Sequence, residues 1–178
     1  AGGATPVLVN AKGVHYGNRF TISGLTVAVS VGFEPVNCEG ADKLIVLDAK
    51  PFRTGTVTET LEHSRTFASR IRLPLVYTNL IGANDSAVFP GGSFMLDLDG
   101  GFIECLPLWE EGVAGVDEIR WPWPGEPENT WRALTTGVGD YVRKNGFKGV
   151  ILGLSGGFDS ALCAAIAVDA LGADKVRA

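Results

Sequence analysis

A glycine-rich turn containing two serines and an aspartate is the segment of this sequence best suited to chemistry. An apolar run, GVILGL, leads into the turn, and a second one, ALCAAIAVDAL, follows it. Where a strand passes into a helix, the first backbone N–H groups of the helix have no partner within it, and the helix dipole adds partial positive charge. Glycines let phosphate oxygens approach such a backbone closely. We therefore predict a phosphate site made by Gly153, Leu154, Ser155, Gly156, Gly157, Phe158, Asp159 and Ser160.

Asp159 is the unexpected member of this turn, because a carboxylate repels phosphate. The repulsion becomes attraction when Mg²⁺ lies between the two groups, since hard cations bind carboxylate and phosphate oxygens together. We therefore predict Asp159 as a metal ligand. Two other phosphate-binding patterns are excluded, because the turn has no lysine for a Walker loop and does not match G-x-G-x-x-G.

The elements before the turn indicate an α/β fold. Almost wholly apolar runs at residues 25–31 and 43–49 are typical of strands covered on both faces. Residues 54–72 repeat apolar and small side chains at spacings of three and four, which predicts a helix. A further strand is expected at residues 75–81. Residues 94–98 and 102–106 then flank Asp-Gly-Gly, which predicts a hairpin.

The last third of the sequence changes character at residues 112–128, where Pro and Trp are frequent and an extended connector is expected. We expect Trp121 and Trp123 to pack on a neighbouring surface. Asn129 is predicted to cap a helix that ends near Asn145-Gly146. A buried strand at 149–154, a buried helix at 161–171 and the start of a strand at 175–178 should follow. The expected apolar face of the helix after Asn129 consists of Trp131, Leu134, Val138, Tyr141 and Val142.

Composition limits the classes of partner. The 178 residues are 46% hydrophobic and 20% charged, which permits a packed core. A net charge of −5 without a basic run disfavours nucleic acid as a partner. We find neither a membrane-spanning apolar stretch nor a secretory signal. Three cysteines without paired spacing disfavour disulfides and zinc, so we expect a reducing cytoplasm.

The run Ser-Gly-Gly-Phe-Asp-Ser at 155–160 resembles the signature of the ATP pyrophosphatases. Its flanks, DYVRKNGF at 140–147 and AAIAVDALGADKVRA at 164–178, resemble the start of the synthetase domain of glutamine-dependent NAD synthetases. Phe158 replaces the isoleucine usual in that family. The resemblance implies ATP and Mg²⁺ as cofactors and deamido-NAD, glutamine and ammonia as small-molecule substrates. It implies adenylation of deamido-NAD and amidation by ammonia from glutamine.

Residues 1–111 are similar to the last part of the amidase domain of the same family, which has the nitrilase fold. The segments that carry this similarity are KPF at 50–52, VYTNLIGAND at 76–85, GGSF at 91–94 and LPLWEE at 106–111. Amidases of that family use a Glu, a Lys and a Cys. Ser30 stands where the Cys is expected, and no Glu or Lys counterpart is found. We therefore assign no catalytic residue.

The other cysteines and the histidines receive no chemical role. Cys38 precedes Glu39 but lies too close to Pro51 for the family's nucleophile, so we interpret it as a small buried residue. Cys105 and Cys163 are expected in packing. His15 and His63 have no acidic or nucleophilic neighbour in the sequence.

These inferences predict a partial nitrilase-like αββα sandwich (1–111), a connector (112–128) and the first strand, loop and helix of a doubly wound ATP pyrophosphatase domain (129–178). We expect a homo-oligomer. We also expect the chain to be either an interior fragment or a degraded copy of a larger two-domain enzyme, incomplete or inactive alone. Two alternatives remain open: an amidotransferase of the ATP pyrophosphatase type with another acceptor, or an amidase-like scaffold without catalysis.

Overall fold

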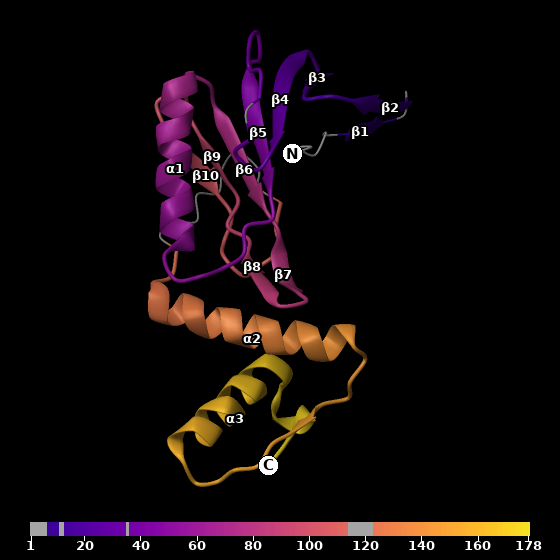
Figure 1. Ribbon diagram of the computed structural model, residues 1–178, viewed down its shortest axis with the longest axis vertical. Coiled ribbons are helices and arrows are strands. Elements are labelled where there is room, and N and C mark those ends of the chain that lie inside the picture. Colours follow the sequence, from indigo (N-terminus) through magenta and orange to yellow (C-terminus); the bar gives the residue numbers. More distant parts are fainter. Residues whose placement is uncertain (1–6, 11–12, 35, 114–122) are drawn as a thin grey trace.

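The computed structural model of this protein describes residues 7–10, 13–34, 36–113 and 123–178, with the backbone alone considered for 7–16 (Figure 1). We call residues 7–113 the N-terminal part and residues 123–178 the C-terminal part. The N-terminal part is built on a six-stranded mixed sheet of order β10-β9-β6-β5-β4-β3. A separate antiparallel hairpin, β1 (Val7–Asn10) and β2 (Gly13–Tyr16), precedes it. The strands of the sheet are β3 (Arg19–Ile22), β4 (Leu25–Val31), β5 (Lys43–Asp48), β6 (Leu75–Asn79), β9 (Phe94–Leu96) and β10 (Phe102–Cys105).

The centre of the sheet is parallel, since β4, β5 and β6 run in the same direction, while β3, β9 and β10 pair antiparallel to their neighbours. The predicted strands at 25–31 and 43–49 and the predicted hairpin at 94–106 are confirmed, with shorter strands in the hairpin. Mixed α/β architecture is therefore confirmed. The carboxyl ends of the three parallel strands lie at one edge of the sheet, where polar sites commonly form.

Helix α1 (Thr56–Ile71) covers one face of the sheet (Figure 1). Leu61, Ser64 and Ala68 from the predicted helical face are buried, while Val57 and Ile71 are only half-buried. Thr56 and Thr60 complete the buried face of the helix. The core beneath it contains fully buried side chains from neighbouring strands: Leu44, Val46, Leu75 and Leu96.

A second hairpin, β7 (Ile81–Asn84) and β8 (Ala87–Pro90), extends beyond the main sheet. The sequence predicts one strand over residues 75–81, and this is wrong at its end. Strand β6 stops at Asn79, and Ile81 already belongs to the hairpin. The turn at Asp85 adopts a left-handed φ of 51°, a conformation that Asp tolerates better than most residues.

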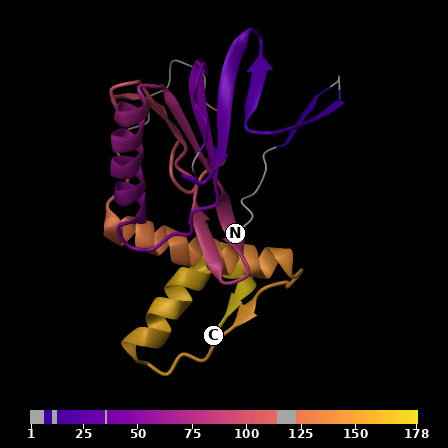
Figure 2. The same ribbon diagram turned by 45° about the horizontal axis from the view of Figure 1, so that its top comes forward.

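Helix α2 (Glu126–Lys144) lies between the β7–β8 hairpin and the remainder of the C-terminal part in both views (Figures 1 and 2). The predicted cap at Asn129 is wrong, because the helix begins within the expected connector, at Glu126, with Gly125 as its N-cap. Asn129 instead lies buried in the first turn. The predicted apolar face is also partly wrong: Val142 is buried, but Leu134 and Tyr141 are exposed.

The C-terminal part continues with β11 (Val150–Ile151), α3 (Phe158–Leu171), the 3₁₀ turn η1 (Ala173–Lys175) and β12 (Val176–Arg177). Strands β11 and β12 pair in parallel, which confirms the strand predicted at 175–178. The expected burial of the preceding strand and helix is not observed. Ile151 is 85% exposed, and Ala167 is the one buried residue of α3. Among the described residues, α3 packs against α2, η1 and β12, and β11 pairs with β12, which leaves much of both apolar surfaces open.

The described portion of the connector confirms one expectation. Trp123 packs against Phe94 and Phe102, and its indole N–H donates to the carbonyl of Leu106 at 2.8 Å. Trp121 lies outside the described residues. Among the described residues, no helix has the length and apolar character needed to cross a bilayer.

Candidate functional site

The glycine-rich turn joins β11 to α3 as an exposed loop. Gly156 adopts a φ of +78°, which glycine reaches without the steric cost of a side chain. A Cβ at this position would meet nothing within 4 Å, so the constraint comes from backbone conformation and not from lack of space. The chain then returns to extended backbone at Gly157, the N-cap of α3, where no side chain caps the helix.

The N-terminus of α3 therefore presents uncapped backbone N–H groups toward solvent. The helix begins at Phe158, so Phe158, Asp159 and Ser160 form its first turn and not the loop that the sequence suggests. This places the three residues where the helix dipole and the unpaired amides act together. The predicted phosphate residues thus form one contiguous segment, exposed at residues 153–159 and half-buried at Ser160.

A pair of serine hydroxyls holds the loop in shape. The Oγ atoms of Ser155 and Ser160 lie 3.1 Å apart, and the Ser160 hydroxyl donates to the carbonyl of Gly157 at 3.0 Å. The same Ser160 Oγ accepts from the N–H of Ser155 at 3.3 Å. The two hydroxyls thus connect the start of the loop to the first turn of α3.

Asp159 and Phe158 both project from the first turn of α3 into solvent. Phe158 is 82% exposed. Asp159 is exposed and makes no ion pair with the described residues. A carboxylate without an ion-pair partner, next to unpaired backbone amides, is a suitable ligand for a hard cation that also binds phosphate oxygens.

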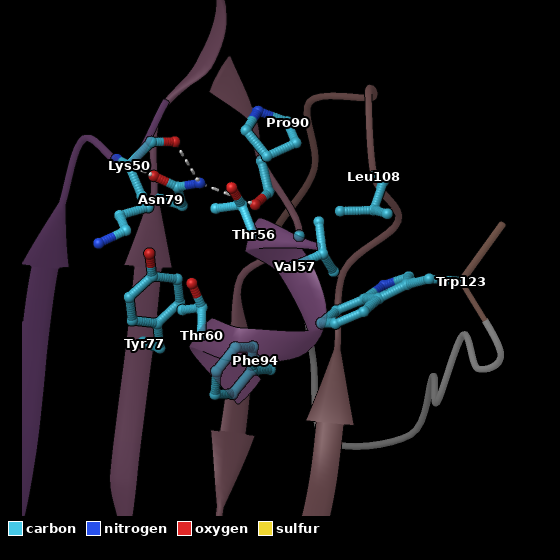
Figure 3. Close-up of a pocket in the computed structure, with 12 residues that line it drawn as sticks. Lys50, Thr56, Val57, Thr60, Tyr77, Asn79, Pro90, Phe94, Leu108 and Trp123 are labelled. Atoms are coloured by element: carbon cyan, nitrogen blue, oxygen red, sulfur yellow. Dashed lines mark hydrogen bonds between the residues drawn. The ribbon is translucent and has the colours of Figure 1, made fainter. Parts of the chain in front are cut away.

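A small cavity lies at the carboxyl ends of the parallel strands in the N-terminal part (Figure 3). Its volume is about 10 Å³, which is roughly the space of one water molecule. Asn79 closes one side of it, because its side chain accepts from the N–H of Lys50 at 2.8 Å and donates to the carbonyl of Gly91 at 3.2 Å.

Tyr77 forms the floor of this cavity and is 2% exposed. Its hydroxyl donates to Asp48 Oδ2 at 3.0 Å. Burial raises the pKa of Tyr77 well above its usual value, and the neighbouring Asp48 carboxylate raises it further, against a smaller opposing effect of Thr60. The phenol therefore stays protonated in the folded protein.

A wider, open cleft of about 460 Å³ adjoins the cavity at Lys50 and Thr60. Its lining includes the charged side chains of Glu34, Asp48 and Glu59, and Glu59 is paired with Arg53. His63 lies on the rim, and its ring contacts that of Phe33 at 4.4 Å between centroids, which is a packing interaction.

Neither Ser30 nor Cys38 is activated as a nucleophile. Ser30 is buried and donates its hydroxyl hydrogen to the carbonyls of Gly32, at 2.7 Å, and Glu34, at 3.1 Å. Cys38 is half-buried, and burial raises the pKa of its thiol, which disfavours the nucleophilic thiolate. Cys105 is buried as predicted, whereas Cys163 is exposed, so the packing interpretation of Cys163 is wrong in this structure. The described residues contain no group of three or more potential metal ligands.

Asp140 is an important polar residue that the sequence reasoning missed. It lies on α2, its side chain is 16% exposed, and Oδ2 accepts the N–H of Ala83 in β7 at 2.8 Å. Burial alone would raise its pKa, but the Ala83 N–H and the side chains of Arg143 and Lys144 outweigh this, and the pKa of Asp140 lies below its usual value. Sequence periodicity places Asp140 beside an apolar face and gives no sign of its partner.

Residues 130–178 match the NAD synthase family. Over 150 residues, the chain is 42% identical to a glutamine-dependent NAD(+) synthetase of Rhodobacter capsulatus, with 78% of this chain and 27% of that protein covered. Over 152 residues it is 41% identical to the Synechocystis protein of the same name, with the same two coverages. The chain thus spans about a quarter of the length of these relatives.

Solved structures of glutamine-dependent NAD synthetases also match this chain. The glutamine-dependent NAD+ synthetase of Acinetobacter baumannii, solved in complex with ADP, matches with a TM-score of 0.79 and 29% identity over 89% of this chain and 34% of that one. A glutamine-dependent NAD(+) synthetase of Cytophaga hutchinsonii matches with a TM-score of 0.72 at 20% identity, over 97% of this chain and 31% of that one, which shows a shared fold.

Proposed function

We propose a function for this chain on the premise that it belongs to the family of glutamine-dependent NAD(+) synthetases, of whose members it spans about a quarter. In this proposal the Gly153–Ser160 segment binds the phosphates of ATP. The observation that carries it is the uncapped N-terminus of α3, which follows a left-handed glycine and presents its amides to solvent. The relative solved with ADP supports a nucleotide as the ligand.

The chemistry of Asp159 suits Mg²⁺, a hard cation that binds carboxylate and phosphate oxygens. Asp159 is exposed and free of ion pairs with described residues, so its carboxylate would hold the cation next to the helix N-terminus. When bound there, the cation would neutralise charge that develops on pyrophosphate. Ser155 and Ser160 keep the loop closed around the open amides.

We further propose that the complete protein uses this loop to adenylate a carboxylate. In such a step, a carboxylate oxygen of deamido-NAD attacks the α-phosphorus of ATP, and pyrophosphate leaves. Ammonia then attacks the activated carbonyl carbon, AMP leaves, and an amide results. The contribution of this chain is to bind and orient the leaving pyrophosphate through backbone donors, which is electrostatic stabilisation of developing charge.

Backbone amide titration by NMR tests the phosphate site on the chain itself. Pyrophosphate and then ATP with Mg²⁺ are added, and shifts should concentrate in residues 155–160. Gly156→Ala should abolish these shifts, because alanine resists the φ of +78°. Gly146→Ala is the matched control, since Gly146 has a φ of +69°, equally open surroundings and a place outside the loop.

Two results would contradict the proposal. One is an absence of shifts at residues 155–160 at millimolar ATP in the wild-type chain. The other is equal loss of binding in both glycine variants, which would show that general strain and not the loop controls binding.

For the N-terminal part we propose the scaffold alternative over glutamine hydrolysis. The Ser30 hydroxyl is hydrogen-bonded to backbone carbonyls, and burial raises the pKa of the Cys38 thiol, which favours its protonated form. Ammonia release from glutamine, measured on the chain, should therefore stay at background. Release at enzyme-like rates that Cys38→Ala abolishes would overturn this view.

The remaining expectations stand as proposals: boundaries at 111/112 and 128/129, a nitrilase-like origin of the N-terminal part, a cytoplasmic location and a homo-oligomer. The alternative is that the complete protein is an amidotransferase of the ATP pyrophosphatase type that adenylates a different acceptor. Comparing deamido-NAD with other carboxylates in a pyrophosphate-release assay on the complete protein decides between the two.

A further inference from the structure

We propose that α2 joins the two parts of this chain into one folding unit through a permanent interface with the β7–β8 hairpin, and that Asp140 is the positioning residue of this interface. The phosphate-loop segment, residues 153–160, then keeps a fixed place relative to the N-terminal sheet. The proposal does not depend on what the loop binds.

The interface is centred on the backbone of a single residue in β7. Ala83 donates its N–H to Asp140 Oδ2 at 2.8 Å, and its carbonyl accepts from the ammonium group of Lys144. Asp140 is held in turn by Arg143, whose guanidinium donates to Oδ1 at 2.5 Å. The hairpin strand thus gains two bonds from α2, and the carboxylate has partners for both oxygens.

The two surfaces approach closely at two glycines, beside an open cleft of about 630 Å³ that residues of both the hairpin and α2 line. Gly82 has a φ of +99°, and a Cβ there would lie 2.8 Å from Asp140 Oδ2. Any side chain at this position would therefore displace the carboxylate. On the other side of the contact, a Cβ at Gly137 of α2 would lie 3.4 Å from Val88. Glycines on both surfaces let the helix and hairpin backbones approach.

The opposite end of α2 is anchored to the N-terminal part as well. Glu126 Oε1 accepts the N–H of Gly55, at the start of α1, at 2.9 Å. Asn129 Oδ1 accepts the indole N–H of Trp109 at 2.9 Å. With a rise of about 1.5 Å per residue, Glu126 and Asp140 lie roughly 20 Å apart along the helix. Two attachments this far apart prevent α2 from rotating on the N-terminal part.

The other side of α2 supports α3. The Trp131 indole N–H donates to Asp169 Oδ2 at 2.6 Å. A Cβ at Gly139 would lie 3.3 Å from the carbonyl oxygen of Ala170, so the two helices cross closely. Because α3 begins at the phosphate-loop segment, the place of the loop follows from the docking of α2 (Figure 2).

Cutting the folded chain tests the proposal directly. A protease site is inserted between Gly112 and Val113, where Val113 is 99% exposed, and the full chain is cleaved after folding. The two fragments should co-elute on size exclusion. Asp140→Ala should raise their dissociation constant about ten- to hundredfold, the usual effect of losing hydrogen bonds to a charged group. Glu128→Ala is the control, because Glu128 is exposed and, among the described residues, forms an ion pair with Arg132 within α2.

Hydrogen exchange on the uncut chain separates positioning from general destabilisation. In Asp140→Ala the Ala83 amide should exchange at least tenfold faster, while the Val46 amide in the central sheet keeps its rate. Asp140→Asn retains an oxygen acceptor and should recover part of the protection. Separation of the wild-type fragments after cleavage, or equal behaviour of Asp140→Ala and Glu128→Ala, would overturn the proposal.

Discussion

Ionisation of Tyr77 should control the alkaline stability of this protein. The phenol is 2% exposed and donates to Asp48, and burial beside that carboxylate raises its pKa. A raised pKa means that the folded state holds its proton above pH 10, where the unfolded state loses it. Stability is then fully present below the unfolded pKa of about 10 and declines as pH rises above it.

The magnitude follows from a single proton. The free energy of unfolding should fall with a limiting slope of about 1.4 kcal/mol per pH unit, which amounts to about 1 kcal/mol between pH 10 and pH 11. Tyr77→Phe removes the ionising group, so this share of the decline should disappear. Any contribution of other ionisable groups to the decline is common to all variants.

Urea unfolding at pH 9, 10 and 11 measures this effect, followed by intrinsic tryptophan fluorescence. Tyr141→Phe is the matched control, because Tyr141 is 61% exposed and should leave the alkaline decline unchanged. The reasoning would be refuted if Tyr77→Phe and the wild-type chain lost stability in parallel between pH 10 and pH 11, or if Tyr141→Phe changed the slope as strongly.

Other substitutions and pH changes should have equally specific effects. Leu44→Ala should lower the free energy of unfolding by about 2–5 kcal/mol, because Leu44 is completely buried. Leu134→Ala, at a 46% exposed site, should change the free energy of unfolding far less. Urea unfolding of both variants measures the difference. Asn129→Ala should cost about 1–3 kcal/mol by leaving the Trp109 indole without its acceptor, with a change in tryptophan fluorescence as a second measurement. Because the pKa of Asp140 is lowered, its stabilising contribution is present above its unfolded pKa and is lost as pH falls through the folded value. A lower protection of the Ala83 amide in acid, measured relative to the intrinsic exchange rate at each pH, would show this loss, and Asp140→Asn should remove the pH dependence.

The sequence predicts the parts of the fold whose signals are local. Strands β4 and β5 coincide with almost uninterrupted apolar runs, and α1 coincides with a helical repeat that stops before Pro74. The glycine-rich turn could be located for the same reason, because its flanks are a strand and a helix and its residues are contiguous.

Errors arise where local signals favour two structures at once. Pro127 suggests an extended connector, but proline is also favoured in the first turn of a helix, and here it lies in the first turn of α2. Asn129 is a good cap by type, yet its side chain accepts from Trp109 and donates to the carbonyl of Pro124. The burial expected for α3 was wrong because burial depends on neighbouring layers, which the composition of a helix does not determine.

The β7–β8 hairpin shows why polar residues on a helix can determine tertiary structure. A two-stranded hairpin is marginally stable by itself, and an outer strand leaves backbone groups that need partners. Asp140 and Lys144 supply those partners to Ala83, and Gly82 provides the space. Periodicity treats charged helix positions as solvent-facing, so it cannot detect this arrangement. The polar docking of α2 therefore stabilises the hairpin and, through α3, fixes where the phosphate-loop segment lies.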